Sequence, residues 1–323
     1  MKEFLPAVLG MFYIGSAYAD NTLIYFEAQG IGGYSSGEHK AVYHSFDKHD
    51  AMQKNSLGVD LLHKFSGHSG DWGAAALQVR LAYDDDDKDL TPQFYNAYLK
   101  YKTSTGDIWG GHNRIAYGLS SYWDTHSDLI GDLTMQGVGF DRDWGVGYNY
   151  DYEKGNISAS LTSGTGMNIR DYGNWLAATR ASYGVMNYDN YTFGASVMFG
   201  KTLDTMGYEI MDKYPKDTWL LGIDTAYNVN NFEHKAELDG GERNHYAYWA
   251  ALYRLSIKLD NDEQWKWDIQ PTYVYEEKNE DWTFANALNY QLTSDIKLSF
   301  MHRYQHQNND NMYIGQVYFY KPI

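Results

Sequence analysis

The chain of 323 residues contains no cysteine, only five prolines and, after its first residues, no long apolar segment. The absence of cysteine fits an oxidising compartment, where stray thiols are a liability. Beyond residue 19 no segment approaches the roughly 18 consecutive apolar residues that a membrane helix needs. The sequence therefore predicts no membrane-spanning helix.

Basic residues are also scarce, with 26 Lys and Arg against 42 Asp and Glu, which gives a formal net charge of −16. The lysines and arginines are not clustered into a basic stripe that would neutralise phosphates. Nucleic acid is therefore excluded as an expected partner.

Aromatic residues and glycine are abundant instead, with 31 Tyr, 10 Trp and 31 Gly, although the mean hydropathy is only −0.58. A soluble domain of this length would build its core from Leu, Ile and Val more than from Tyr. A Tyr-rich, Gly-rich and Pro-poor composition is typical of a membrane β-barrel with a polar lumen and aromatic girdles.

The N-terminus has the pattern of a secretory signal peptide. Lys2 precedes an apolar stretch over 4–14, and Ala17-Tyr18-Ala19 forms an A-x-A cleavage site. We expect residues 1–19 to be a signal peptide that is removed after Ala19. The remainder, 20–323, has no linker or change in composition and is predicted to be one barrel domain.

Segments of alternating hydrophobicity fill the mature chain, most of them close to the 9–11 residues that a tilted strand needs to cross a bilayer. We predict an all-β, transmembrane antiparallel barrel of about sixteen strands, with fourteen as the alternative. The sixteen segments are 21–30, 53–65, 71–83, 92–103, 105–116, 137–153, 156–163, 174–184, 191–200, 217–228, 231–238, 244–258, 263–275, 281–291, 295–305 and 311–320.

The connections between these segments alternate in length. Every second one is a tight turn, such as 67–70, 153–156 and 260–262. The others are mostly longer, such as 31–52, 117–136 and 201–216. Short periplasmic turns on one side and long external loops on the other are typical of an outer-membrane barrel.

The direction of each side chain follows from its parity along the strand. In 244–258, Trp249 and Tyr253 alternate with Arg254 and Lys258. Because lipid cannot hydrate a charge, the apolar set is predicted to face outward and the charged set to face the lumen.

The long acidic loop that follows the fifth segment carries a resemblance to a known family. The chain resembles Gram-negative trimeric porins, including the phosphate-selective type, in its strand rhythm and in the order of four segments. These are GHNRIAYGLSS, DTHSDL, GFDRDWGVGYNYD and ISASLTSGTG. The resemblance implies a third loop folded inward to narrow the pore, passive diffusion of ions and small hydrophilic solutes, and a location in the outer membrane. It also implies a homotrimer, contact with outer-membrane lipid and lipopolysaccharide, and insertion by the barrel-assembly machinery.

Parity and the loop together give a candidate pore constriction. Basic side chains of the wall are expected to face acids of the inward loop and to set up a transverse field that filters ions. Alternatively, these side chains are polar only because a wet lumen requires it. The candidate residues are Arg80, Lys100, Arg114, Asp124, Asp128, Asp132, Arg180, Arg254 and Arg303.

Other functions stay open at this point. If the arginines dominate the constriction, the channel would select anions or acidic oligosaccharides. An omptin-like protease at the barrel rim would use an Asp–His pair, for which His126 and the carboxylates of the 117–136 loop are candidates. His39, His44 and His49 in loop 31–52 match no closed metal motif. We therefore expect no enzymatic activity and assign no catalytic residue, cofactor or metal.

Overall fold

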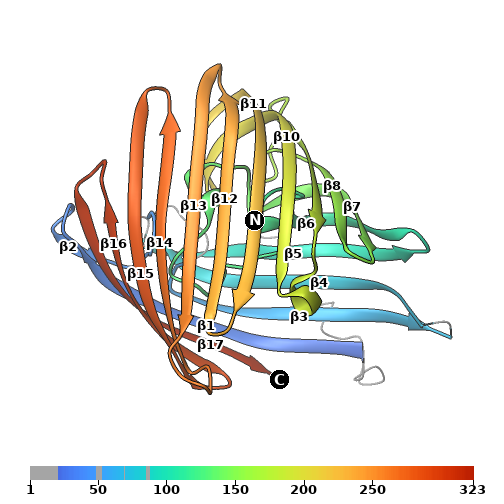
Figure 1. The fold of residues 1–323 in the computed structure, drawn as a ribbon, viewed down its shortest axis with the longest axis horizontal. Coiled ribbons are helices and arrows are strands. Elements are labelled where there is room, and N and C mark those ends of the chain that lie inside the picture. The colour runs from blue at the N-terminus through green and yellow to red at the C-terminus, as the bar shows by residue number, and fades with distance from the viewer. Residues whose placement is uncertain (1–20, 49–52, 69, 85–87) are drawn as a thin grey trace.

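A computed structural model describes residues 21–48, 53–68, 70–84 and 88–323. The predicted signal peptide, 1–19, lies outside these residues. Sixteen strands form the wall of a closed antiparallel barrel (Figure 1), because β1 pairs with β3 on one side and with β17 on the other. The wall strands are β1 (Thr22–Ser35), β3 (Ser56–Gly67), β4 (Gly70–Asp84), β5 (Asp89–Thr103), β6 (Gly106–Arg114), β7 (Arg142–Tyr152), β8 (Gly155–Thr162), β9 (Trp175–Tyr183), β10 (Tyr191–Met206), β11 (Glu209–Val229), β12 (Phe232–Arg243), β13 (Tyr246–Lys258), β14 (Trp265–Glu276), β15 (Asn279–Thr293), β16 (Ile296–Gln305) and β17 (Asp310–Pro322).

Each of the sixteen predicted segments corresponds to one wall strand, so the predicted fold class and the count of sixteen are confirmed. The additional strand β2 (Lys40–Val42) pairs with the end of β1 and is not part of the wall. No helix in the described part of the chain is long and apolar enough to cross a membrane.

The predicted alternation of side chains is also observed. On β13, Trp249 and Tyr253 are 53% and 41% exposed on the outer surface, whereas Arg254, the residue after Tyr253, is 2% exposed and faces the interior. Leu81 and Leu99 are likewise exposed on the outside. The outer surface is therefore apolar in its middle, as contact with lipid requires.

Aromatic side chains collect near the strand ends on this outer surface. Trp72 stacks on Phe65 at a centroid distance of 4.9 Å, and Trp265 stacks on Tyr290 at 4.3 Å. Trp109, although it also lies near a strand end, is not part of this aromatic girdle. It is 3% exposed and packs against Gly147 of β7, where a Cβ atom would collide with the indole.

The two ends of the barrel differ. We call the end with the tight turns at 104–105, 153–154 and 230–231 the turn end, and the opposite end the loop end. The predicted loop 201–216 is wrong, because β10 and β11 continue as a paired hairpin up to Gly207 and Tyr208. The connection between β9 and β10 contains the short helix α2 (Met186–Asp189).

Candidate constriction and inward loop

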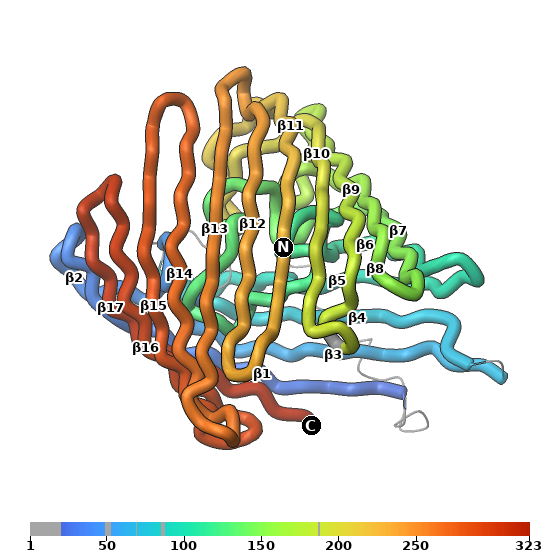
Figure 2. The backbone as a smooth tube through the Cα atoms, in the orientation of Figure 1, coloured from blue at the N-terminus to red at the C-terminus, as the bar shows by residue number. Residues whose placement is uncertain are grey.

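Residues 115–141, between β6 and β7, fold into the barrel, and we call them the inward loop. They include the short 3₁₀ helices η2 (Leu119–Ser121) and η3 (Leu133–Gln136). The green backbone of this segment passes behind β12 and β13 in Figure 2. The inward fold predicted for loop 117–136 is therefore confirmed, and the contacts below identify what holds it there.

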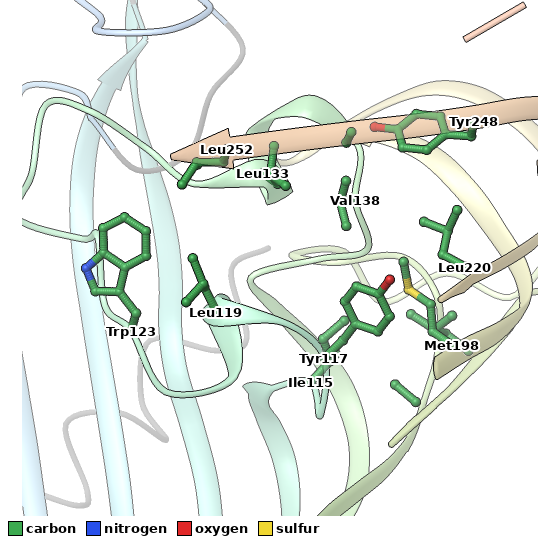
Figure 3. Packing of buried hydrophobic residues seen from close by; sticks show 13 residues of the cluster. Ile115, Tyr117, Leu119, Trp123, Leu133, Val138, Met198, Leu220, Tyr248 and Leu252 are labelled. Carbon is green, nitrogen blue, oxygen red and sulfur yellow. The ribbon is translucent and has the colours of Figure 1, made fainter. Parts of the chain in front are cut away.

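Apolar side chains of the inward loop pack on apolar side chains of the inner wall. Figure 3 shows Ile115 and Tyr117 on the side of Met198 and Leu220 of β10 and β11, and Leu119 of the same cluster nearer Trp123. A second cluster joins Leu129 and Ile130 to inward side chains of β1, β15, β16 and β17. Burial of each such side chain contributes about 1.5–3 kcal/mol. The loop is therefore fixed against the inner wall of the barrel by apolar packing.

Asp124 is the centre of a first charged cluster in the loop. Its carboxylate lies 2.7 Å from Nη2 of Arg114 and 3.3 Å from Nη2 of Arg142. Burial alone would raise the pKa of Asp124, but the two guanidiniums, Arg142 first, hold that pKa below its ordinary value. Asp124 is therefore a carboxylate that ties the loop to β6 and β7.

Tyr95 joins this cluster through an irregularity in β5. Gln78 pairs with Asn96 and Val79 with Phe94, so Tyr95 is the extra residue of a β-bulge. Its hydroxyl donates to Asp124 at 3.2 Å, and its ring lies 3.5 Å from the Arg142 guanidinium carbon. Parity counted from the C-terminal end of β5, where Leu99 and Tyr101 face outward, gives the wrong direction for Tyr95, because the bulge shifts the alternation by one residue.

Asp128 forms a second charged cluster on the opposite wall. It accepts from Nζ of Lys297 at 3.0 Å and from Nη1 of Arg254 at 3.4 Å. Burial would raise the pKa of Asp128, but the surrounding cations, with Lys297 first, hold that pKa below its ordinary value. Arg254 also donates to the carbonyls of Ile130 at 2.6 Å and Gly131 at 3.0 Å.

The Arg254 guanidinium is further held by the wall and by an aromatic ring. Its Nε donates to Gln270 at 2.7 Å, and its central carbon lies 4.2 Å from the Trp123 ring centroid. Arg254 thus contacts three separate parts of the inward loop.

Glu27 on β1 forms the third cluster, together with His126 and Arg80. Nε2 of His126 lies 2.5 Å from Oε1 of Glu27, and Nη1 of Arg80 lies 3.9 Å from the same oxygen. The only hydrogen bond between Asp124 and His126 runs from the backbone N–H of His126 to Oδ1 of Asp124, at 2.9 Å. The Asp–His pair considered for a rim protease is therefore not formed by these side chains, and His126 is 5% exposed inside the barrel.

Two wall acids that the sequence reasoning did not select also bind the loop. Asp239 on β12 accepts from the Tyr117 hydroxyl at 2.8 Å, and Glu237 accepts from the Leu119 backbone N–H at 3.2 Å. Parity alone could have placed both in the lumen, because they alternate with the exposed Leu238. The loop-facing wall is therefore acidic on this side.

The remaining predicted residues are distributed more widely. Arg180 makes two hydrogen bonds with Asp224, at 2.9 and 2.7 Å, and lies over Tyr122. Arg303 donates to the Phe46 carbonyl at 2.9 Å. Lys100 is not brought to the loop, since its ammonium lies 3.2 Å from Asp107 near the turn end.

Asp132 has a structural contact of its own, as the residue that caps η3. Its Oδ1 accepts from the backbone N–H of Thr134 at 3.0 Å and from the Thr134 hydroxyl at 2.5 Å. Burial, followed by the nearby Asp141 carboxylate, raises the pKa of Asp132 to about 6. Unlike Asp124 and Asp128, this acid is not matched by a cation.

The raised pKa makes Asp132→Asn a pH-dependent stabilising change. The folded protein binds a proton at Asp132 more tightly than the unfolded chain, so this contribution to stability is present below pH 4 and is lost as the pH rises through 6. Asparagine retains the cap without the charge, and we expect the variant to gain up to about 3 kcal/mol at pH 7.5 and nothing at pH 3.5. Equal gains in unfolding free energy at both pH values would contradict this account.

The described residues contain no group of three His, Asp or Glu side chains able to hold a metal ion. His49, one of the three histidines considered above, lies outside the described residues. The site is thus a set of ion pairs and hydrogen bonds between a loop and the wall that surrounds it.

No protein-family model and no curated protein sequence matches this chain. Solved structures do. OmpT of Vibrio cholerae in its trimer form has a TM-score of 0.66 at 13% identity, covering 93% of this chain and 98% of that one. Salmonella typhi OmpF has a TM-score of 0.69 at 11% identity with the same coverage, and the anion-selective porin of Comamonas acidovorans has 0.62 at 10%, covering 94% and 100%. The chain therefore has the sixteen-stranded barrel fold of the Gram-negative outer-membrane porins.

Proposed function

We propose that this protein is an outer-membrane porin, a water-filled channel for passive diffusion of ions and small hydrophilic solutes. The observation that carries the proposal is a closed barrel of sixteen strands whose outside is apolar and whose interior holds an ion-paired loop. A barrel of this size is wide enough to leave an aqueous path, unlike an eight-stranded barrel filled by its own side chains. No cofactor or catalytic step is part of this function.

The location and partners follow from the same proposal. A chain with a signal peptide over 1–19 and an apolar belt is delivered to the outer membrane of a Gram-negative bacterium, where the barrel-assembly machinery inserts it among lipid and lipopolysaccharide. We propose a homotrimer, because the similar OmpT structure is described as a trimer.

The ion pairs bear on which ions such a channel would prefer. Arg114, Arg254 and Arg180 each lie beside a carboxylate, so the cations of the wall are largely compensated. Wall acids such as Glu237 add negative charge. This favours a weakly cation-preferring channel over the anion- or acidic-oligosaccharide-selective alternative.

Planar-bilayer recording of the refolded mature chain tests both points. We expect stable ohmic steps and, under a salt gradient, a reversal potential of the sign that cations give. The double variant Arg80→Ala with Arg114→Ala should shift the reversal potential further towards cations. A folded barrel without conductance steps would contradict the channel function, and an unchanged reversal potential would remove both arginines from the conducting path.

A further inference from the structure

A cavity of about 490 Å³ lies at the loop end, between the inward loop and the hairpins β10–β11 and β14–β15. Its volume is within the range of about 300–1,000 Å³ found for small-molecule sites. Arg142 and Asp141 line it, and both also contact Tyr95 of the first charged cluster, around Asp124. A solute entering from the loop end would therefore meet this cavity before the constriction.

The lining of the cavity carries an excess of negative charge. Six carboxylates line it, against two guanidiniums. Arg243 is shared between Asp204 at 3.4 Å and Glu276 at 3.5 Å. Within the described residues, Asp281 accepts only from neutral groups, the Gln305 amide at 2.8 Å and the Gln307 backbone N–H at 3.0 Å. Arg142 pairs with Asp141, and Lys216 lies 3.0 Å from Asp204, so these two acids are compensated. No ion pair in the described part of the chain reaches Glu277, Glu280 or Asp281, so the lining keeps an excess of negative charge.

Apolar side chains form another part of the same lining. Phe46, Met135, Phe140 and Met206 come from three separate segments and are each partly exposed. Aromatic rings and thioethers offer adaptable contact to an apolar or aromatic body. The cavity thus combines an apolar surface with uncompensated carboxylates.

One buried acceptor in the lining also lacks a partner. Asp141 is 7% exposed, and its Oδ2 is ion-paired with Arg142 and also accepts from the Tyr95 hydroxyl at 3.1 Å, whereas its Oδ1 is buried without a hydrogen-bond partner. A buried acceptor without a donor costs free energy, and a ligand that supplies an N–H group would remove that cost.

We propose that this cavity is a binding site for organic cations with an apolar body, of which aryl-alkyl amines are the simplest. The ammonium group would lie beside Glu276 and Asp281, and the apolar body against Phe46, Phe140 and Met135. The inference rests on the proposed channel function and adds to it the class of solute that is concentrated at the entrance.

Three probes of similar size separate charge from shape: phenethylamine, 2-phenylethanol and 3-phenylpropionate. Binding is measured by calorimetric titration of the folded full barrel in a zwitterionic detergent at low salt. We expect phenethylamine to bind about tenfold or more tightly than either of the others, and its affinity to fall as salt is added. Equal binding of the three probes would overturn the proposal.

The double variant Glu276→Gln with Asp281→Asn retains the hydrogen-bond acceptors and removes two charges. It should lose the preference for the amine, whereas Glu153→Gln with Asp262→Asn, which removes two charges at the turn end, should retain it. Folding of the double variant is checked by the electrophoretic mobility of the unheated barrel. If that mobility is changed, Glu280→Gln replaces the double variant, and the same loss of preference for the amine is expected. Amine binding that survives in a folded charge variant overturns the site.

Conductance recorded on the same samples separates the two hypotheses. Steps without selective amine binding would reject the site and leave the channel. Selective binding to a barrel that conducts no ions would reject the channel function and leave the cavity as a binding site.

Discussion

Replacing residues 121–132 by a four-residue Gly-Ser linker should raise the single-channel conductance about twofold or more. The replaced segment includes Trp123, Leu129 and Ile130, which fill the interior, and both loop acids that bind wall cations. Its removal widens the narrowest part of the path. It also leaves Arg114, Arg254 and Lys297 without their carboxylate partners, so the ion preference should move towards anions.

The two effects of this deletion can be measured separately. Conductance steps in a planar bilayer report the width, and the reversal potential under a salt gradient reports the charge. Asp124→Asn with Asp128→Asn is the matched control, because it removes the charges and retains the loop volume. It should move the reversal potential towards anions with a much smaller change in conductance. Unchanged conductance after the deletion would show that the loop does not restrict the path.

Arg254→Ala should release the inward loop from the wall. The guanidinium is 2% exposed and binds Asp128, two loop carbonyls and Gln270. Removing one partner of such a buried ion pair typically costs about 3–5 kcal/mol, because the other groups remain buried and unsatisfied. The loop should then fluctuate between positions, and open-channel current noise should increase together with susceptibility of the loop to proteolysis.

Two further substitutions calibrate this result. Arg254→Lys retains a charge but cannot reach Asp128, Gln270 and both carbonyls at once, so an intermediate effect is expected. Lys258→Ala removes a cation of the same strand whose exposed pair with Glu263 lies at the turn end, and it should change the noise little. Quiet channels in Arg254→Ala would mean that the apolar clusters and the other ion pairs hold the loop without Arg254.

Much of the fold could be predicted from the sequence because each strand carries its own signal. Lipid on one side and water on the other impose a period of two on every strand, so Trp249 and Arg254 reveal their directions without knowledge of any neighbour. The acidic loop was also predictable as the segment that narrows the lumen, although there the porin resemblance supplied the reason. The limits of parity appear at Tyr95, where one inserted residue reverses the alternation within β5.

The partners of the loop residues were decided only by the tertiary structure. Tyr117 meets Asp239, 122 residues away, and Arg254 meets Ile130, 124 residues away. Such contacts depend on where the closed barrel places opposite walls, which no local pattern encodes. Sequence alone therefore determined that this chain is a barrel with a polar interior and, where the alternation is regular, which side chains face inward. Closure of the barrel around the loop decided that most of the predicted arginines are paired there, because packing brings acids of the loop and of distant strands within hydrogen-bonding distance of them.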